Sequence, residues 1–465
     1  MKRLLPLLCL GALSCAVGPD YERPDIPQPA AWRDGTAEAA SLADVEWWKL
    51  FGDPVLNGLI GNALAANFDV RLAVERVAEV RARLGFVRAD LYPRLDAGAE
   101  AGVVRDSLEA APLSPLIRDR DYQTYTLFGA LSWELDLFGR IRRAVEAERA
   151  GLAAAEEDRH AAMVSVIAEV AQAYLDVRDL DARVEISKAT VASRRSYVDL
   201  AKLRFEGGKT PEVDLRQAEA ELGRVESILF DLERRLAERE HDLAFLLGRN
   251  PGPVPRGRPL AEIPIPPQIP PGLPAALLRR RPDIRGAEQR LVAANARIGE
   301  AEALLYPRIA LTAQAGYSSI QLSEFLKSPA GFWEIIGGIT APIWDWGKNR
   351  ARVQETEAVM RQAVILYERS IRQALRDVED ALVAYRKSVA ILESNGRRTT
   401  AQRSVLNLSE ARYRGGVSTY LEVLDAQREL FDAELQQAGA LRDRIVSVVR
   451  LYRALGGGWE ASPPE

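Results

Sequence analysis

The sequence is poor in the side chains that carry covalent and metal chemistry. It has two histidines and two cysteines in 465 residues, and both cysteines, Cys9 and Cys15, lie within the first fifteen positions. The rest of the chain therefore offers no disulfide, no thiol nucleophile and no Cys/His metal site. A formal net charge of −4 gives no basic surface for nucleic acid. We therefore expect neither an enzyme, nor a metal or organic cofactor, nor a nucleic-acid partner.

The first residues are typical of an export signal. A short cationic start is followed by the apolar run Leu4–Leu13, which is too short to span a bilayer. Cys15 follows Ala12-Leu13-Ser14, which is similar to a bacterial lipobox, where the cysteine is acylated and becomes the first residue. Ala12 departs from the usual Leu or Val, so a plain signal peptide cleaved nearby is the alternative. We expect a covalent lipid on Cys15 that ties the chain to membrane lipids.

The two halves of the chain repeat each other. Leu91-Tyr92-Pro93-Arg94 returns as Leu305-Tyr306-Pro307-Arg308, and Arg204-Phe205-Glu206-Gly207-Gly208 returns as Arg412-Tyr413-Arg414-Gly415-Gly416. A duplication of this length predicts two internal structural repeats. We expect a signal peptide over 1–14, a lipidated extended segment over 15–52, repeat 1 over 53–250, a proline-rich linker over 251–280, repeat 2 over 281–456 and a tail over 457–465.

Long helices are expected in both repeats. Residues 140–206 contain no proline and could form one helix of about 100 Å, and residues 348–414 repeat this pattern. Helices of such length must pack lengthwise against similar helices, and an ordinary dimeric coiled coil would satisfy that need equally well. Between the repeats, ten prolines from Pro251 to Pro274 exclude a helix or a central strand. The predicted helices cover about 140–205, 212–247, 348–413 and 419–455.

Amphipathic strands are expected before each pair of helices. The segments at about 94–136 and 308–343 are predicted to hold two strands each. Three of them alternate apolar and polar residues, and the fourth, near Trp333 to Ile343, is glycine-rich and less regular. This alternation is typical of membrane-barrel strands, but it also fits a half-buried strand in a soluble sheet. Four strands are too few to close a barrel, which needs about eight, and lipid does not tolerate open strand edges. If these strands span lipid, several chains must pool them.

Several motifs, in order along the chain, resemble those of the TolC-like outer membrane factors, in the lipoprotein branch that serves resistance-nodulation-division (RND) efflux systems. They are Gly18-Pro19-Asp20-Tyr21-Glu22-Arg23-Pro24, the segment from Trp47 to Leu56, Arg281-Pro282-Asp283-Ile284-Arg285, Tyr413-Arg414-Gly415-Gly416 and Leu424-Asp425-Ala426-Gln427-Arg428.

The resemblance implies a mainly α fold with a membrane β-barrel. Three chains, each giving four strands, would form a homotrimer with a 12-stranded β-barrel in the cell outer membrane. Twelve helices would continue it as a periplasmic α-barrel. The implied function is passive export of small molecules such as drugs, toxic compounds or metal ions. An inner membrane RND pump and a periplasmic adaptor would be the partners.

Each long helix must reverse direction at a glycine pair. Glycine accepts the left-handed backbone that ends a helix, while Thr210 and either Ser418 or Thr419 can cap the helix that follows. The resemblance implies that these turns are the tips that contact the adaptor, although helix reversal needs no partner. The expected tip residues are Gly207, Gly208, Lys209, Gly415, Gly416 and Val417.

The start of the last helix carries charges that its counterpart lacks. Leu421, Asp425 and Arg428 fall at i, i+4 and i+7, on one helix face. The equivalent residues 208 positions earlier are Val213, Gln217 and Ala220. This loss of symmetry suggests a role that the first repeat does not share.

The resemblance implies that Leu421, Asp425 and Arg428, with Glu422 and Tyr413, form a periplasmic gate. Ion pairs between chains would hold it closed, and a ring of carboxylates would bind cations. The alternative is a surface Asp–Arg pair worth less than about 1 kcal/mol.

Two other functions fit parts of the sequence. A type I secretion duct would share the fold, but the lipoprotein-like start favours efflux. A non-conducting periplasmic coiled-coil scaffold would explain the long helices. It would explain neither the paired amphipathic strands nor the charges confined to repeat 2.

Overall fold

The structure is a computed structural model that describes residues 16–33, 46–105, 107, 121–265, 274 and 277–457. The predicted signal peptide, Cys15 and parts of the predicted linker and tail lie outside these residues. Two compact units divide the chain. Unit 1 holds the described residues of Met1–Asp25, Val77–Ala155 and Ala287–Tyr367, and unit 2 holds those of Ile26–Arg76, Glu156–Gly286 and Glu368–Glu465. Each unit thus draws on both sequence repeats.

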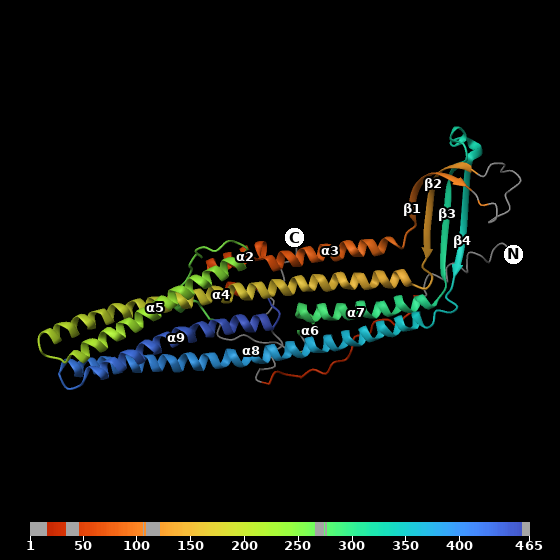
Figure 1. The fold of residues 1–465 in the computed structure, drawn as a ribbon. Helices are drawn as coiled ribbons and strands as arrows, with labels where there is room; N and C mark the ends of the chain where they lie inside the picture. Colours follow the sequence, from red (N-terminus) through yellow and green to blue (C-terminus); the bar gives the residue numbers. More distant parts are fainter. Residues whose placement is uncertain are drawn as a thin grey trace. The chain divides into compact units, whose positions relative to one another are not determined.

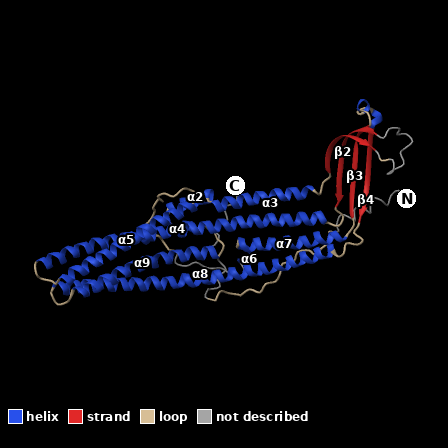
Figure 2. Cartoon of the chain, in the orientation of Figure 1, coloured by secondary structure: helices blue, strands red, loops and turns tan. Residues whose placement is uncertain are grey.

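Unit 1 contains a four-stranded antiparallel sheet (Figure 2). The strand order is β1-β2-β3-β4, so β1 and β4 are the outer strands, and no other described strand pairs with their free edges. The strands are β1 (Arg94–Arg105), β2 (Asp121–Leu135), β3 (Arg308–Ser319) and β4 (Gly331–Thr340).

The register of the sheet sorts the alternating residues onto two different faces. Leu95, Leu131, Ala313 and Ile335 lie opposite one another across the four strands. The adjacent row is Asp96, Ala130, Gln314 and Glu334, which belongs to the other face. Leu95 is 75% exposed and Ile335 is 64% exposed, so the described residues of this chain leave the outer parts of the apolar face uncovered.

The Gly-Pro-Asp-Tyr-Glu-Arg-Pro motif is a strap fastened to unit 1. Arg143 donates hydrogen bonds to the carbonyl oxygens of Val17 and Gly18, each at 3.1 Å. A Cβ atom on Gly18, whose φ is +97°, would lie 2.3 Å from the Cα of Gly299. At the other end of the strap, Arg23 Nε donates to Glu288 Oε1 at 2.6 Å. The motif therefore holds this extended segment in close contact with Arg143, Glu288 and Gly299 of unit 1.

Four long helices form two pairs, each joined by a short turn (Figure 1). Helices α4 (Arg140–Glu206) and α8 (Lys348–Arg414) each have 67 residues, and α5 (Glu212–Leu246) and α9 (Tyr420–Ala454) each have 35. These equal lengths are the structural counterpart of the sequence duplication. No described helix contains a stretch long and apolar enough to cross a membrane.

The described residues also form shorter helices. They are α2 (Pro54–Ala66), α3 (Phe68–Ala89), α6 (Leu277–Arg280) and α7 (Pro282–Glu302), with 3₁₀ turns at Trp47–Phe51, Leu260–Glu262, Ala303–Leu305, Leu322–Glu324 and Ser328–Ala330.

The two hairpin turns have the same backbone geometry. Gly208 and Gly416 have φ of +68° and +74°, a region that favours glycine. The amide of the next residue then donates to a carbonyl five residues back, Lys209 to Arg204 at 2.8 Å and Val417 to Arg412 at 3.0 Å.

The prediction of side-chain caps at these turns is wrong. Neither α5 nor α9 has a side-chain capping hydrogen bond. Pro211 occupies the N-cap position of α5 and has no side-chain acceptor, and Thr210 precedes it. The hydroxyls of Thr210 and Ser418 are buried and have no hydrogen-bond partner among the described residues.

The Phe51-Gly52-Asp53-Pro54 segment builds a buried polar hub in unit 2. Asp53 is fully buried and caps α2, its Oδ1 accepting from the amide of Val55 at 2.9 Å. Its Oδ2 accepts from the hydroxyl of Tyr174, on α4, at 2.7 Å. A Cβ on Gly257 would lie 2.2 Å from Asp53, so only glycine fits there. Burial, followed by the bond to Asp53, raises the pKa of Tyr174. The hub joins α2, α4 and the proline-rich segment.

Candidate functional site

The predicted tip residues lie on the surface of the chain at the two hairpin turns. Gly207, Gly208 and Lys209 are exposed between α4 and α5, and Gly415, Gly416 and Val417 are exposed between α8 and α9. The glycines leave the backbone uncovered there, and Val417 adds an exposed apolar side chain. Both turns are therefore accessible to a partner in a single chain.

The start of α9 presents one exposed face. Leu421, Glu422 and Asp425 are exposed, while the intervening Val423 and Leu424 are buried. Leu421 is 51% exposed, and its counterpart Val213, at the start of α5, is 54% exposed. Asp425 forms no hydrogen bond or ion pair with any residue that the structure describes. Leu421 and Asp425 thus lie free on the same surface, as their spacing predicts.

Arg428 lies beside this face but is bound within its own chain. Its Nε donates to Oε2 of Glu221, on α5, at 2.7 Å. Arg224 donates to the other oxygen of the same carboxylate at 2.9 Å. Burial alone would raise the pKa of Glu221, but the hydrogen bonds from Arg224 and Arg428 lower it below its ordinary value. The fully buried carboxylate is therefore charged and holds α9 to α5.

Glu221 could not be found from the asymmetry of the repeats. Its counterpart 208 positions later, Glu429, is also a glutamate, so no difference between the repeats marks it. The pair with Arg428 joins positions of different repeats, and only the fold brings the two together.

Tyr413 and Glu422 have partners close to the turns. Arg412 Nε lies 3.6 Å from Glu422 Oε2. The guanidinium carbon of Arg204 lies 4.9 Å from the ring centroid of Tyr413, a cation–π contact between α4 and α8. The ring of Tyr413 also meets that of Tyr420, with centroids 5.7 Å apart. Tyr413 thus lies between the two hairpins.

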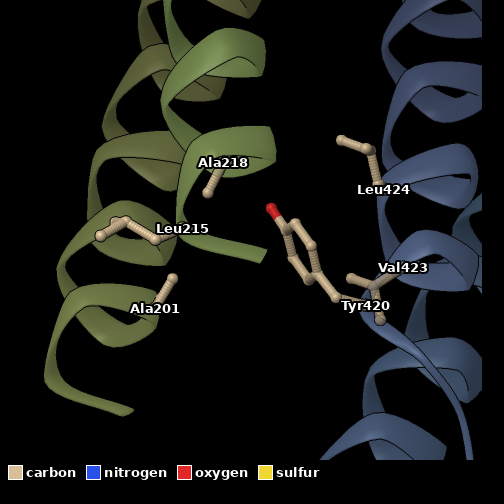
Figure 3. Packing of buried hydrophobic residues seen from close by; sticks show 6 residues of the cluster. All are labelled: Ala201, Leu215, Ala218, Tyr420, Val423 and Leu424. Atoms are coloured by element: carbon tan, nitrogen blue, oxygen red, sulfur yellow. The ribbon is translucent and has the colours of Figure 1, made fainter. Parts of the chain in front are cut away.

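An apolar cluster joins the hairpins behind the exposed face (Figure 3). Tyr420 points from α9 toward α5, with its hydroxyl directed toward Ala218. That hydroxyl has no hydrogen-bond partner among the described residues, and burial raises the pKa of Tyr420 to about 12. The members of the cluster are Ala201, Leu215, Ala218, Tyr420, Val423 and Leu424.

Two further hydrogen bonds cross between the hairpins. Arg194 Nη2, on α4, donates to the backbone oxygen of Gln427 at 3.0 Å, and the Tyr197 hydroxyl donates to Glu410 of α8. These bonds, the Arg428–Glu221 pair and the Tyr420 cluster are called the inter-hairpin contacts below. The sequence analysis did not select Tyr420. A comparison of the repeats could have found it, because its counterpart in repeat 1 is the charged residue Glu212.

Known proteins match the chain over nearly all of its length. The family model described as outer membrane efflux protein matches residues 59–249 and 273–457. The toluene efflux pump outer membrane protein TtgI of Pseudomonas putida is 35% identical over 467 residues, which are 99% of this chain and 98% of that protein. The probable outer membrane lipoprotein SilC of Salmonella typhimurium is 33% identical over 453 residues, 96% of this chain and 95% of that one.

A solved structure shares the fold. The outer-membrane channel OprN superimposes with a TM-score of 0.88 at 34% sequence identity, covering 96% of this chain and 100% of that chain. The expected fold class, mainly helical and TolC-like with four strands per chain, is confirmed. The chain is a non-enzymatic outer membrane channel component of an efflux system, and it belongs to the outer membrane efflux protein family.

Proposed function

We propose that this chain forms a homotrimer that serves as the exit duct of a tripartite RND-type efflux system. Three sheets, joined through the free edges of β1 and β4, give a 12-stranded barrel with its exposed apolar row toward lipid. Three sets of α4, α5, α8 and α9 give a 12-helix periplasmic tunnel. Substrates pass through passively, because nothing in the hairpins supplies energy.

The gate of this duct is the exposed face at the start of α9, and this face is the observation that carries the proposal. Repeated around a threefold axis, Leu421 gives an apolar collar and Asp425 a carboxylate ring that retains cations. Asp425 has no partner among the described residues of its own chain, whereas Arg428 is held by Glu221 at 2.7 Å. Opening the aperture requires α9 to move away from α5, which breaks the inter-hairpin contacts.

The six tip residues are the docking point for the periplasmic adaptor. They are exposed on two turns of the same geometry, which suits a partner that binds both turns alike. The inner membrane pump, reached through the adaptor, selects the cargo. The name of TtgI, a toluene efflux pump outer membrane protein, favours small toxic compounds such as solvents over exported proteins as the cargo.

The N-terminal lipid is part of the same proposal. SilC is described as a probable outer membrane lipoprotein, and Cys15 of this chain follows a lipobox-like sequence. An acyl chain there adds a second membrane attachment beside the barrel.

Removing the charges of the gate should widen it. The double variant Asp425→Ala/Arg428→Ala should raise single-channel conductance in a planar bilayer severalfold, and Glu221→Gln should raise it too, because it releases Arg428. Glu226→Gln is the matched control, since Glu226 lies on the same helix but pairs with exposed Arg195 at 3.0 Å. Unchanged conductance in correctly assembled charge variants would rule out the gate.

The Tyr420 cluster gives a second test of how the hairpins are held together. Tyr420→Ala should destabilise the local packing by about 3–5 kcal/mol and speed amide hydrogen exchange in the first turns of α9. Tyr420→Phe should leave exchange as slow as in the parent or slower, because the hydroxyl it removes has no partner. If Tyr420→Phe sped amide hydrogen exchange as much as Tyr420→Ala, the result would contradict this packing.

Lipidation has a simple readout. Cells grown with labelled palmitate should incorporate label into the parent protein and into Cys9→Ser, since Cys9 leaves with the signal peptide. Cys15→Ser should carry no label. Label that persists in Cys15→Ser would refute the lipid site.

A further inference from the structure

Unit 2 contains a cavity of about 700 Å³ between α4, α8, α9 and the proline-rich segment near Leu260. This volume lies within the range of small-molecule sites. Most of the lining is apolar, with Ile186, Leu260, Leu406, Leu430, Phe431 and Leu441 among the residues that contribute to it.

One buried cation lies in the wall of this cavity. Arg194 is only 4% exposed, and the one hydrogen bond that it makes within the described part of the chain goes to the backbone carbonyl of Gln427. Its Nε has no hydrogen-bond partner, and no carboxylate of the described chain lies within ion-pair distance of its guanidinium. Burial lowers its pKa, as expected for a charge removed from water. A buried guanidinium without a carboxylate is uncommon, because burying an unpaired charge is costly.

The acids near Arg194 are already occupied. Glu221, the acid whose charge acts most strongly on Arg194, already binds both Arg224 and Arg428. Within the cavity wall, Glu434 pairs with Arg403 at 2.7 Å. The other wall acid, Glu185, lies at the exposed side and pairs with Lys188 at 3.5 Å. These three acids are therefore already paired with other cations.

A second unpartnered polar group lies beside the cation. Gln427 is 1% exposed, and neither its amide oxygen nor its amide nitrogen has a hydrogen-bond partner among the described residues. A carboxylate can accept from both a guanidinium and an amide NH₂, so it would satisfy the donors of both groups once these shielded side chains turn toward the cavity, although not the amide oxygen of Gln427. An apolar body next to that carboxylate would then fill the rest of the cavity.

We propose that this cavity binds an amphipathic carboxylate, whose head group is held by Arg194 and Gln427 and whose aliphatic tail lies against the apolar wall. Such a ligand would lie among the inter-hairpin contacts. The proposal concerns binding alone and does not depend on the gate.

Sodium octanoate is a suitable probe, because it is soluble and has both a carboxylate head group and an aliphatic tail. Titration calorimetry with the purified full-length protein in non-ionic detergent should detect saturable octanoate binding, with octan-1-ol at least tenfold weaker. Arg194→Met keeps the bulk of the side chain but removes the charge, and should weaken octanoate binding about tenfold or more. Ala189→Trp, which fills the cavity without changing its charge, should abolish binding.

Arg195→Met is the matched control, because Arg195 is the neighbouring arginine, is exposed and pairs with Glu226 outside the cavity. It should bind octanoate as the parent does. Circular dichroism and size-exclusion chromatography confirm that each variant is folded and assembled. Octanoate binding that survives Arg194→Met or Ala189→Trp would overturn the proposal. So would equal affinity for octan-1-ol, or no saturable binding to the parent.

Discussion

The free edges of β1 and β4 are the constraint on which the rest of the assembly depends. Their backbone groups have no strand partner among the described residues of this chain, and a lipid environment offers none. Other copies of the same sheet can supply the missing partners on both edges. Because α4 begins five residues after β2 ends, and α8 eight residues after β4 ends, the number of chains that closes the sheet also sets the number of helices that follow it.

The duplication gives two helical hairpins of matched length, and the differences between the repeats make the contacts of the two hairpins unequal. Helices of matched length and turns of matched geometry come from the two repeats. The side chains that join one hairpin to the other differ, however. Tyr420 replaces Glu212 and Arg428 replaces Ala220, so α9 carries an anchor and a cation that α5 lacks. The buried Glu221 turns that difference into a contact between non-equivalent helices.

The sequence was sufficient for features that depend on local pattern. Proline-free stretches predicted long helices, alternation predicted the amphipathic strands, and glycine pairs predicted the reversals. The confirmed TolC-like fold class came from the resemblance of the motifs, since these patterns alone also fit a coiled coil or a soluble sheet. The comparison of repeats marked Asp425, and helical spacing placed Leu421 on the same face, where the fold leaves both side chains exposed.

Contacts between segments that are distant in the sequence could not be predicted from the sequence. The partner of Arg428 lies 207 residues away and that of Asp53 lies 121 residues away, and no local pattern connects either pair. The predicted caps at Thr210 and Thr419 failed for a different reason. Pro211 rather than Thr210 occupies the N-cap position of α5, and Thr419 occupies that of α9 without a side-chain hydrogen bond.

Closure of the sheet by neighbouring chains is the central claim, and cysteine cross-linking across its edges tests it most directly. Single cysteines placed in the middle of β1, at Ala97, Ala99 or Ala101, would be combined with one at Ile335 or Gly337 of β4 and oxidised in outer membranes. The account predicts, for the pair in register, a non-reducing ladder of one, two and three chains that stops at three. Cross-links confined to single chains, or a ladder that ends at another number, would contradict it.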